Sequence, residues 1–172
     1  MNGFLLLIPF LLIRFGLLSL LDKDGLKRAA FFAPLIGGER TAYWCYQISN
    51  LLILIYPFFL KVTTEKAWLY AGLATYGLGI LLCLVSVFNF ASPAANGMNL
   101  EGLYRLSRNP MYIAYFIYFL GCALLTQSLL LFVVVMVFQI SAHWIILAEE
   151  RWCLQQFGQQ YKHYMSKVRR YI

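Results

Sequence analysis

The chain has 172 residues, of which 62% are hydrophobic and 12% charged, and its formal net charge is +7. About a quarter of the residues of an ordinary soluble domain are charged, so this composition excludes a soluble globular enzyme and leaves no room for a separate soluble catalytic domain. It predicts an integral membrane protein whose active site, if it has one, is built from transmembrane helices and their connectors. Basic residues beside membrane spans usually set topology and contact lipid headgroups, so the positive charge does not indicate nucleic-acid binding.

Apolar runs predict five transmembrane helices, because a helix of roughly 20 residues crosses a bilayer. We expect them at residues 3–21, 42–60, 67–90, 110–125 and 128–147. The first run lacks a basic n-region and a small-residue cleavage site, which indicates a retained helix rather than a signal peptide. It contains Arg14, a charge that is costly in lipid. Such an arginine either packs against another helix or snorkels to the interface, or else it faces a substrate cavity.

The third span carries Gly72, Gly77 and Gly79, which would permit close helix packing, and it has no glycine fingerprint of a dinucleotide fold. The four cysteines are scattered, with neither a CxxC pair nor the spacing of metal ligands. We therefore expect no disulfide and no metal.

A polar connector at residues 91–109 is followed by the fourth span, and the stretch EGLYRLSRNPMY, residues 101–112, crosses the boundary between them. Asn is a favoured N-cap and Pro suits the first helical position, so Asn109 and Pro110 predict a helix start. A helix start offers free backbone N–H groups and a positive dipole end, which favour a carboxylate or phosphate. The alternative is that Asn109 and Pro110 only cap the helix.

Only Thr126 and Gln127 separate the last two spans, which predicts a tight helical hairpin. The antiparallel helices would bring Asn109 to the level of Glu149 and Glu150 at one membrane face. We expect the two glutamates at the C-terminal end of the fifth span, where the helix dipole disfavours acids and a ligand role would explain them. From Glu149 onward, apolar residues recur every three or four positions, which predicts an amphipathic helix lying along the interface.

The basic residues are distributed unevenly between the two ends of the predicted spans. The connectors that follow the first and third spans and the C-terminal segment hold most of them, whereas the other side keeps Lys61 and Lys66. The positive-inside rule then predicts an outer N-terminus and a cytoplasmic C-terminus. The converging polar clusters would also be cytoplasmic, and in a bacterium the membrane would be the inner or plasma membrane.

Several short motifs follow one another in the C-terminal half. They are GLYRLSRNPMY, the hairpin, His143 followed by Glu149 and Glu150, FGQQY at residues 157–161, and VRRY near the end. In order and spacing, roughly from residue 89 to residue 171, they resemble the isoprenylcysteine carboxyl methyltransferase and phospholipid methyltransferase family. The resemblance implies an all-α polytopic membrane methyltransferase. It would use S-adenosylmethionine, release S-adenosylhomocysteine, and act on a lipophilic acceptor such as an isoprenylcysteine carboxylate or a phospholipid amine.

The resemblance also implies a division of the chain and a set of site residues. Residues 1–172 would form one membrane domain, with three spans in residues 1–90 and the cofactor-binding connector, hairpin and terminal helix in residues 91–172. The expected cofactor-binding residues are Asn89, the segment from Asn96 to Asn99 with Gly97 and Met98, Tyr104, Arg108, Asn109, Pro110, Met111, Tyr112 and Glu149. His143 and Glu150 are the candidate catalytic proton acceptors for an amine or phenol, whereas a carboxylate acceptor would need no strong base. His143 could instead make a helix-packing hydrogen bond.

Two positions depart from the family pattern. Asn109 stands where the family has a histidine before the proline, so we assign it no acid–base role. Ile145 stands where the eukaryotic prenylcysteine enzymes have an arginine four residues before the first glutamate, which leaves the acceptor open.

Two other functions also fit the sequence. One is an NADPH-dependent membrane sterol or lipid reductase of related architecture, with Arg105, Arg108, Arg169 and Arg170 on the 2′-phosphate. The other is a non-enzymatic membrane scaffold or transporter subunit. The sequence predicts a lipid or lipophilic substrate. It identifies neither the methyl acceptor nor the oligomeric state.

Overall fold

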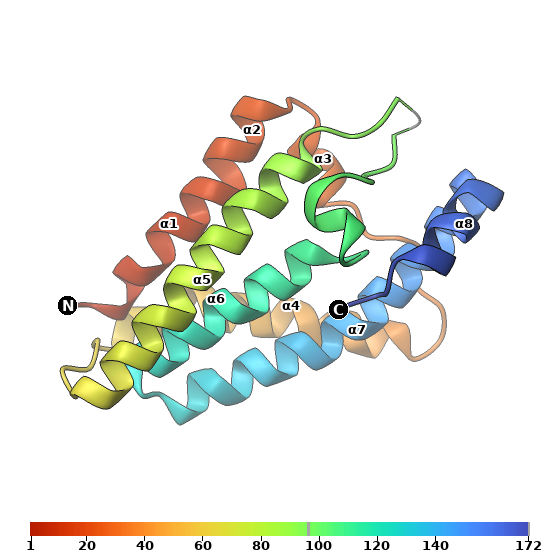
Figure 1. The fold of residues 1–172 in the computed structure, drawn as a ribbon. Helices are drawn as coiled ribbons and strands as arrows, with labels where there is room; N and C mark the ends of the chain where they lie inside the picture. Colours follow the sequence, from red (N-terminus) through yellow and green to blue (C-terminus); the bar gives the residue numbers. More distant parts are fainter. Residues whose placement is uncertain (96, 172) are drawn as a thin grey trace.

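The fold is all-α in the computed structural model, which describes residues 1–95 and 97–171 (Figure 1). Within these residues, three helices are long and apolar enough to cross a membrane: Gly3–Leu21, Lys66–Phe90 and Leu129–Phe157. Pro110–Thr126 is a shorter apolar helix. The predicted all-α membrane class is therefore confirmed, whereas the number of spans stays a prediction.

The first span changes its helical geometry along its length. It begins as a 3₁₀ helix, η1 (Gly3–Leu7), and continues as α1 (Ile8–Leu11). A π-helical segment, η2 (Leu12–Leu17), follows and contains Arg14, before α2 (Leu18–Leu21) ends the span. The short helix α3 (Gly25–Ala29) lies in the connector that follows.

Four longer helices form the rest of the bundle. They are α4 (Glu39–Ile55), which is followed by the 3₁₀ turn η3 (Tyr56–Phe59), α5 (Lys66–Phe90), α6 (Pro110–Thr126) and α7 (Leu129–Phe157). The 3₁₀ turn η4 (Gly102–Arg105) lies in the connector between α5 and α6, and α8 (Gln159–Lys167) follows α7. Most of α6 packs on α5 and most of α7 packs on α4, while α6 and α7 contact each other less extensively.

The end of α7 corrects one expectation. The helix continues to Phe157, ten residues beyond the expected limit, so Glu149 and Glu150 lie within it and the dipole argument does not apply to them. No helix-breaking residue stands between Leu147 and Phe157, and the break comes at Gly158, whose φ of 53° lies in the left-handed region that glycine adopts readily. The separate terminal helix therefore begins at Gln159 rather than at Glu149.

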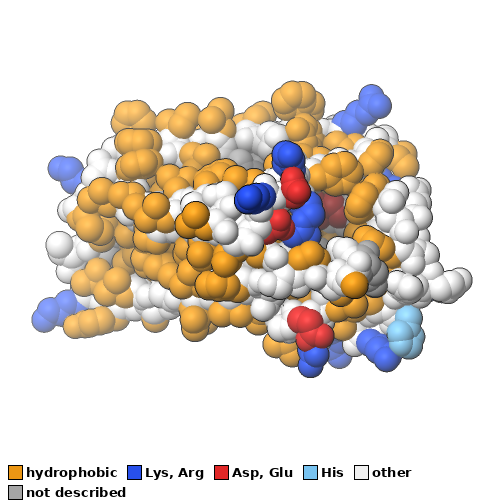
Figure 2. Space-filling view, turned by 90° about the horizontal axis from the view of Figure 1, so that it is seen from above, with side chains coloured by type: hydrophobic (Ala, Val, Ile, Leu, Met, Phe, Trp, Pro, Cys, Tyr) orange, Lys and Arg blue, Asp and Glu red, His pale blue; other side chains and the backbone are white. Residues whose placement is uncertain are grey.

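Polar connectors gather at one end of the bundle. At the opposite end, the Gly3 amide donates to the Leu60 carbonyl at 2.8 Å and the Thr63 amide donates to that of Leu125 at 2.7 Å. Figure 1 places the N-terminus beside that end, and the connectors before α4 and α6 lie at the other. Seen from above, the surface is mostly hydrophobic, and its acidic side chains lie in the right half of the view (Figure 2).

Glycines let α5 and α6 approach until their backbones touch. A Cβ added at Gly79 would lie 2.5 Å from the Tyr118 Cα, and one added at Gly121 would lie 2.6 Å from the Tyr76 Cα. The Tyr118 hydroxyl donates to the Leu6 carbonyl, which ties this contact to the first span. The close packing predicted from Gly79 is thus made between the third and fourth apolar segments.

We expect Gly79→Ala to destabilise the protein by about 2 kcal/mol, because the added methyl group overlaps backbone atoms that cannot move aside. Gly77→Ala is the matched control, since a Cβ there meets nothing within 4 Å and alanine favours a helix by roughly 0.5–1 kcal/mol. Thermal unfolding in detergent measures both. Equal unfolding temperatures for the two variants would contradict the proposed contact.

Candidate active site

A cavity of about 510 Å³ lies at the polar end of the bundle. Its walls come from the first span, the connector that holds α3, one residue each of α4 and α5, the connector before α6, the start of α6, the last third of α7, and α8. Pockets that enclose small molecules usually have volumes of roughly 300–1,000 Å³, so this cavity is large enough for a nucleoside-sized ligand.

Most of the residues expected at the site line this cavity. The set is Gly97, Met98, Asn99, Tyr104, Arg108, Asn109, Met111, Tyr112, Glu149 and Glu150. The two polar clusters that are far apart in the sequence therefore meet in space. Their binding of a cofactor stays a prediction.

Three expected residues do not line the cavity. The Asn89 side chain accepts a hydrogen bond from the Leu103 amide at 2.9 Å and supports the connector from behind. Pro110 is buried at the start of α6. His143 Nδ1 lies 2.7 Å from the Tyr171 hydroxyl, so its ring contacts the C-terminal segment, residues 168–171. Asn96 lies outside the described residues.

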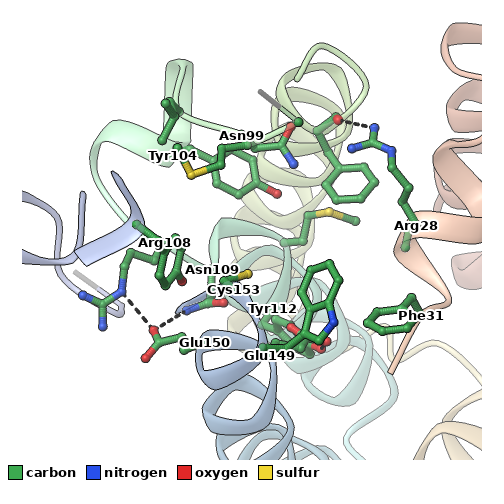
Figure 3. Close-up of a pocket in the computed structure, with 18 of the residues that line it drawn as sticks. Arg28, Phe31, Asn99, Tyr104, Arg108, Asn109, Tyr112, Glu149, Glu150 and Cys153 are labelled. Carbon is green, nitrogen blue, oxygen red and sulfur yellow. Dashed lines mark hydrogen bonds and ion pairs between the residues drawn. The ribbon is translucent and has the colours of Figure 1, made fainter. Parts of the chain in front are cut away.

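Glu150 is the centre of a buried ion-pair cluster, and its side chain is only 5% exposed. Oε1 accepts from Arg108 Nε at 2.9 Å, and Oε2 accepts from Arg170 Nε at 3.0 Å. Arg108 Nη1 also donates to the carbonyls of Met165 and Val168. Figure 3 shows Arg108 and Asn109 pointing toward this carboxylate. Arginines thus engage both oxygens of Glu150, and its role as a proton acceptor stays a prediction. Arg108 is held by the protein rather than free for a ligand carboxylate.

Asn109 occupies the predicted N-cap position, but its side chain does not cap the helix. Its amide nitrogen instead lies 3.5 Å from Glu150 Oε1 and donates to the Arg170 carbonyl at 3.2 Å. The helix start at Pro110 is thus confirmed, while the capping bond is absent. As a result, the Asn109 side chain accepts no hydrogen bond from the first backbone N–H groups of α6.

Glu149 differs from its neighbour in every contact. Its Oε1 accepts a hydrogen bond from the Tyr112 hydroxyl at 2.8 Å, and the described residues provide it with no ion pair. Tyr112 and Glu149 lie next to each other in Figure 3. Of the two glutamates that line the cavity, Glu149 is therefore the one without an ion pair to the described residues.

Tyr104 is held in the 3₁₀ turn η4 and is 8% exposed. Its main-chain oxygen accepts a hydrogen bond from the Tyr164 hydroxyl of α8 at 2.6 Å, which fixes the connector against the terminal helix. Burial raises the pKa of the Tyr104 phenol, so the ring is neutral at physiological pH.

The N-terminal part supplies a wall that sequence reasoning did not assign. Arg28 donates to Asp22 at 2.5 Å and to the Phe90 carbonyl at 3.0 Å, which holds the α3 connector against the end of α5. Phe31 packs against Trp152 of α7, with ring centroids 5.0 Å apart. Of the residues in this wall, the sequence marks Arg14, as a charge within a span.

Three buried polar atoms on the cavity wall have no hydrogen-bond partner. They are Arg14 Nη1, Asn99 Oδ1 and the Tyr115 hydroxyl. Buried polar groups in proteins are nearly always paired, so each of these unpaired atoms calls for an explanation.

Comparison with known families identifies the chain. A model of the phospholipid methyltransferase family matches residues 68–160, which is more than half of the sequence. The chain belongs to the phospholipid methyltransferase family. Neither the curated proteins nor the solved structures contain a significant match.

Membership in the phospholipid methyltransferase family indicates a methyltransferase that works in a membrane. The matched region runs from α5 to the start of α8 and includes the cavity residues from Gly97 to Glu150. Arg14 and Arg28 lie outside it. The part of the cavity shared with the family is thus the connector, α6 and α7, and the first span adds a wall of its own.

Proposed function

We propose that the protein is an integral membrane methyltransferase that transfers the methyl group of S-adenosylmethionine to a lipophilic acceptor and releases S-adenosylhomocysteine. The observation that carries the proposal is the shared cavity of Tyr104, Tyr112 and Glu149, built from segments that the family model matches. The isoprenylcysteine carboxylate and the phospholipid amine are two acceptors of the proposed class.

The cavity residues fit the chemistry of the cofactor. The polar parts of S-adenosylmethionine are an ammonium, a carboxylate, ribose hydroxyls and an adenine. Glu149 would accept hydrogen bonds from the ammonium or the hydroxyls, and the unpaired Asn99 Oδ1 would accept from an amino group. The uncapped start of α6 suits the carboxylate. When bound, the cofactor supplies a sulfonium methyl group that is open to in-line displacement.

The chain's own residues position the reactants and exclude water. Tyr104 and Met111 are buried in the cavity wall, and such a water-poor site favours a displacement between two positioned partners. An acceptor that loses a proton would need a base within reach. Glu149 lines the cavity, whereas His143 does not and Glu150 is paired with two arginines, so the geometry favours Glu149 Oε2 for that role.

We also propose that the chain crosses the membrane five times, as one domain of residues 1–172. Helices α4 and α6 have 17 residues each, and α4 continues into η3. At 1.5 Å per residue, 17 residues span about 26 Å, slightly less than the roughly 30 Å of a hydrocarbon core. The bias of basic residues supports an outer N-terminus and a cavity that faces the cytoplasm.

Three of the four cations proposed for an NADPH-binding reductase form ion pairs with glutamates. Arg105 pairs with Glu101, while Arg108 and Arg170 pair with Glu150. A 2′-phosphate would have to break these pairs. This observation supports the methyltransferase over the reductase.

Calorimetric titration of the purified protein in detergent tests the proposal. We expect S-adenosylhomocysteine to bind and NADPH not to bind, and the reverse result would refute the methyltransferase. Membranes incubated with a labelled methyl donor should then show label in an extractable lipid. Loss of that label in mild base would identify an ester. Label that enters only protein would contradict a lipid acceptor.

A further inference from the structure

The cavity extends to two side chains in the membrane-spanning helices that keep polar atoms unpaired. Arg14 Nη2 donates to the Ala29 carbonyl at 2.7 Å, but Nη1 is buried without a partner. The Tyr115 hydroxyl on α6 is also buried without a partner, and that residue is only 7% exposed. The Arg14 guanidinium carbon lies 5.8 Å from the centre of the Tyr115 ring, and both residues line the cavity.

Arg14 is unusual both in its charge and in its backbone. Within the described residues it forms no ion pair, although an arginine inside a membrane span is costly unless it is paired or reaches water. The π-helical segment Leu12–Leu17 contains it, and π-helical turns are often found at functional sites. Two independent features therefore point to a ligand at Arg14.

Tyr115 shows how deep this part of the cavity lies. It follows Tyr112 by three residues on α6, a rise of about 4.5 Å away from the polar end of the helix. Tyr112 already bonds Glu149, and the connector residues Asn99 and Tyr104 lie on the polar side. Arg14 and Tyr115 thus mark the end of the cavity nearer the membrane interior, where a lipophilic molecule would enter.

We propose that Arg14 and Tyr115 bind an anionic oxygen group, a carboxylate or a phosphate, carried by the lipophilic acceptor. Both unpaired groups can donate a hydrogen bond, from a guanidinium N–H and a phenol O–H, and an ionised oxygen only accepts. The inference depends on the proposed methyltransferase function and narrows its substrate to acidic lipids. It makes the pair a determinant of specificity for the acceptor.

Binding of three amphiphiles with equal chains, measured by titration in a neutral detergent, tests the proposal. The probes are dodecanoate, dodecyl phosphate and the neutral dodecanamide. We expect at least one anion to bind about tenfold more tightly than the amide, the gain typical of a hydrogen bond to a charged group. The anion that shows the larger preference identifies the source of the oxygen group.

Variants then assign the preference to these two residues. Arg14→Gln should reduce the affinity for the anion to that for the amide, and Arg14→Lys should restore part of the difference. Lys27→Gln is the matched control, because it removes one positive charge from the same cavity at an 84% exposed side chain and should change the preference less than about twofold.

Tyr115→Phe gives a second test that does not depend on how Arg14→Gln folds. It removes a hydroxyl that has no partner, so the unfolding temperature should stay the same or rise, while anion affinity falls a few fold. S-adenosylhomocysteine titrated in parallel should bind Tyr115→Phe as tightly as the unmodified protein. Equal binding of anion and amide by the unmodified protein would overturn the inference, and so would an anion preference that survives in Arg14→Gln and in Tyr115→Phe. Failure of the unmodified protein to bind S-adenosylhomocysteine would instead refute the proposed function.

Discussion

Glu149→Gln should lower methyl transfer by roughly 10- to 100-fold, the loss typical when a hydrogen bond to a charged partner is removed. Glutamine keeps the size of the side chain and can still accept from the Tyr112 hydroxyl, which lies 2.8 Å from Oε1. It loses the negative charge that would pair with the cofactor's ammonium. The measurement is titration with S-adenosylhomocysteine, followed by transfer of labelled methyl groups to membrane lipid.

Tyr112→Phe separates charge from orientation. The variant keeps the Glu149 carboxyl group but removes the hydroxyl that holds it in place, so we expect a smaller loss than for Glu149→Gln. Thermal unfolding of both variants should stay close to that of the unmodified protein. Unchanged transfer by Glu149→Gln in a folded protein would show that the cavity serves another chemistry.

Glu150→Ala should destabilise the protein by about 3–5 kcal/mol, because it leaves a buried arginine without its counter-ion. The Arg108 side chain is 8% exposed and pairs with Glu150 at 2.9 Å. The same carboxylate holds Arg170 of the C-terminal segment at 2.9 Å. We therefore expect a lower unfolding temperature and faster proteolysis after Lys167, since the segment beyond α8 would lose its ion pair to the bundle.

Glu101→Ala is the matched control for this prediction. Its pair with Arg105 is exposed, at 66% and 68% of the two side chains, and such surface pairs contribute roughly 0–1 kcal/mol. Similar unfolding temperatures for Glu101→Ala and Glu150→Ala would contradict the structural role of the buried cluster.

The sequence predicted the parts of the fold that depend on hydrophobic length and on helix-start chemistry. Helices α5 and α6 begin within one residue of their expected starts, because Pro110 sets the start of α6 and a long apolar run defines α5. The end of α7 was missed, since the charged residues from Glu149 to Arg151 do not interrupt a helix and one is paired with Glu39 across the bundle. Hydropathy detects lipid contact, and it does not detect a helix that leaves the lipid and continues.

The site was predicted where a local motif marked it and missed where only tertiary packing forms it. The stretch from Tyr104 to Tyr112 and the two glutamates do converge on the cavity. The different roles of Glu149 and Glu150 were not predictable, because adjacent residues of a helix point in different directions and only the fold shows that Arg108 and Arg170 reach the second. The sequence makes His143 a candidate base, but its contact with Tyr171 depends on where the C-terminal segment lies.

The wall formed by the first span and the α3 connector has an evolutionary consequence. It lies outside the region matched by the family model, which contains the cavity residues from Gly97 to Glu150. Descendants of one ancestor could thus exchange the lipid they modify by drift in their first forty residues, while the chemistry of the donor stays fixed. Diversity of acceptors within such a lineage should then be recorded in the N-terminal helices.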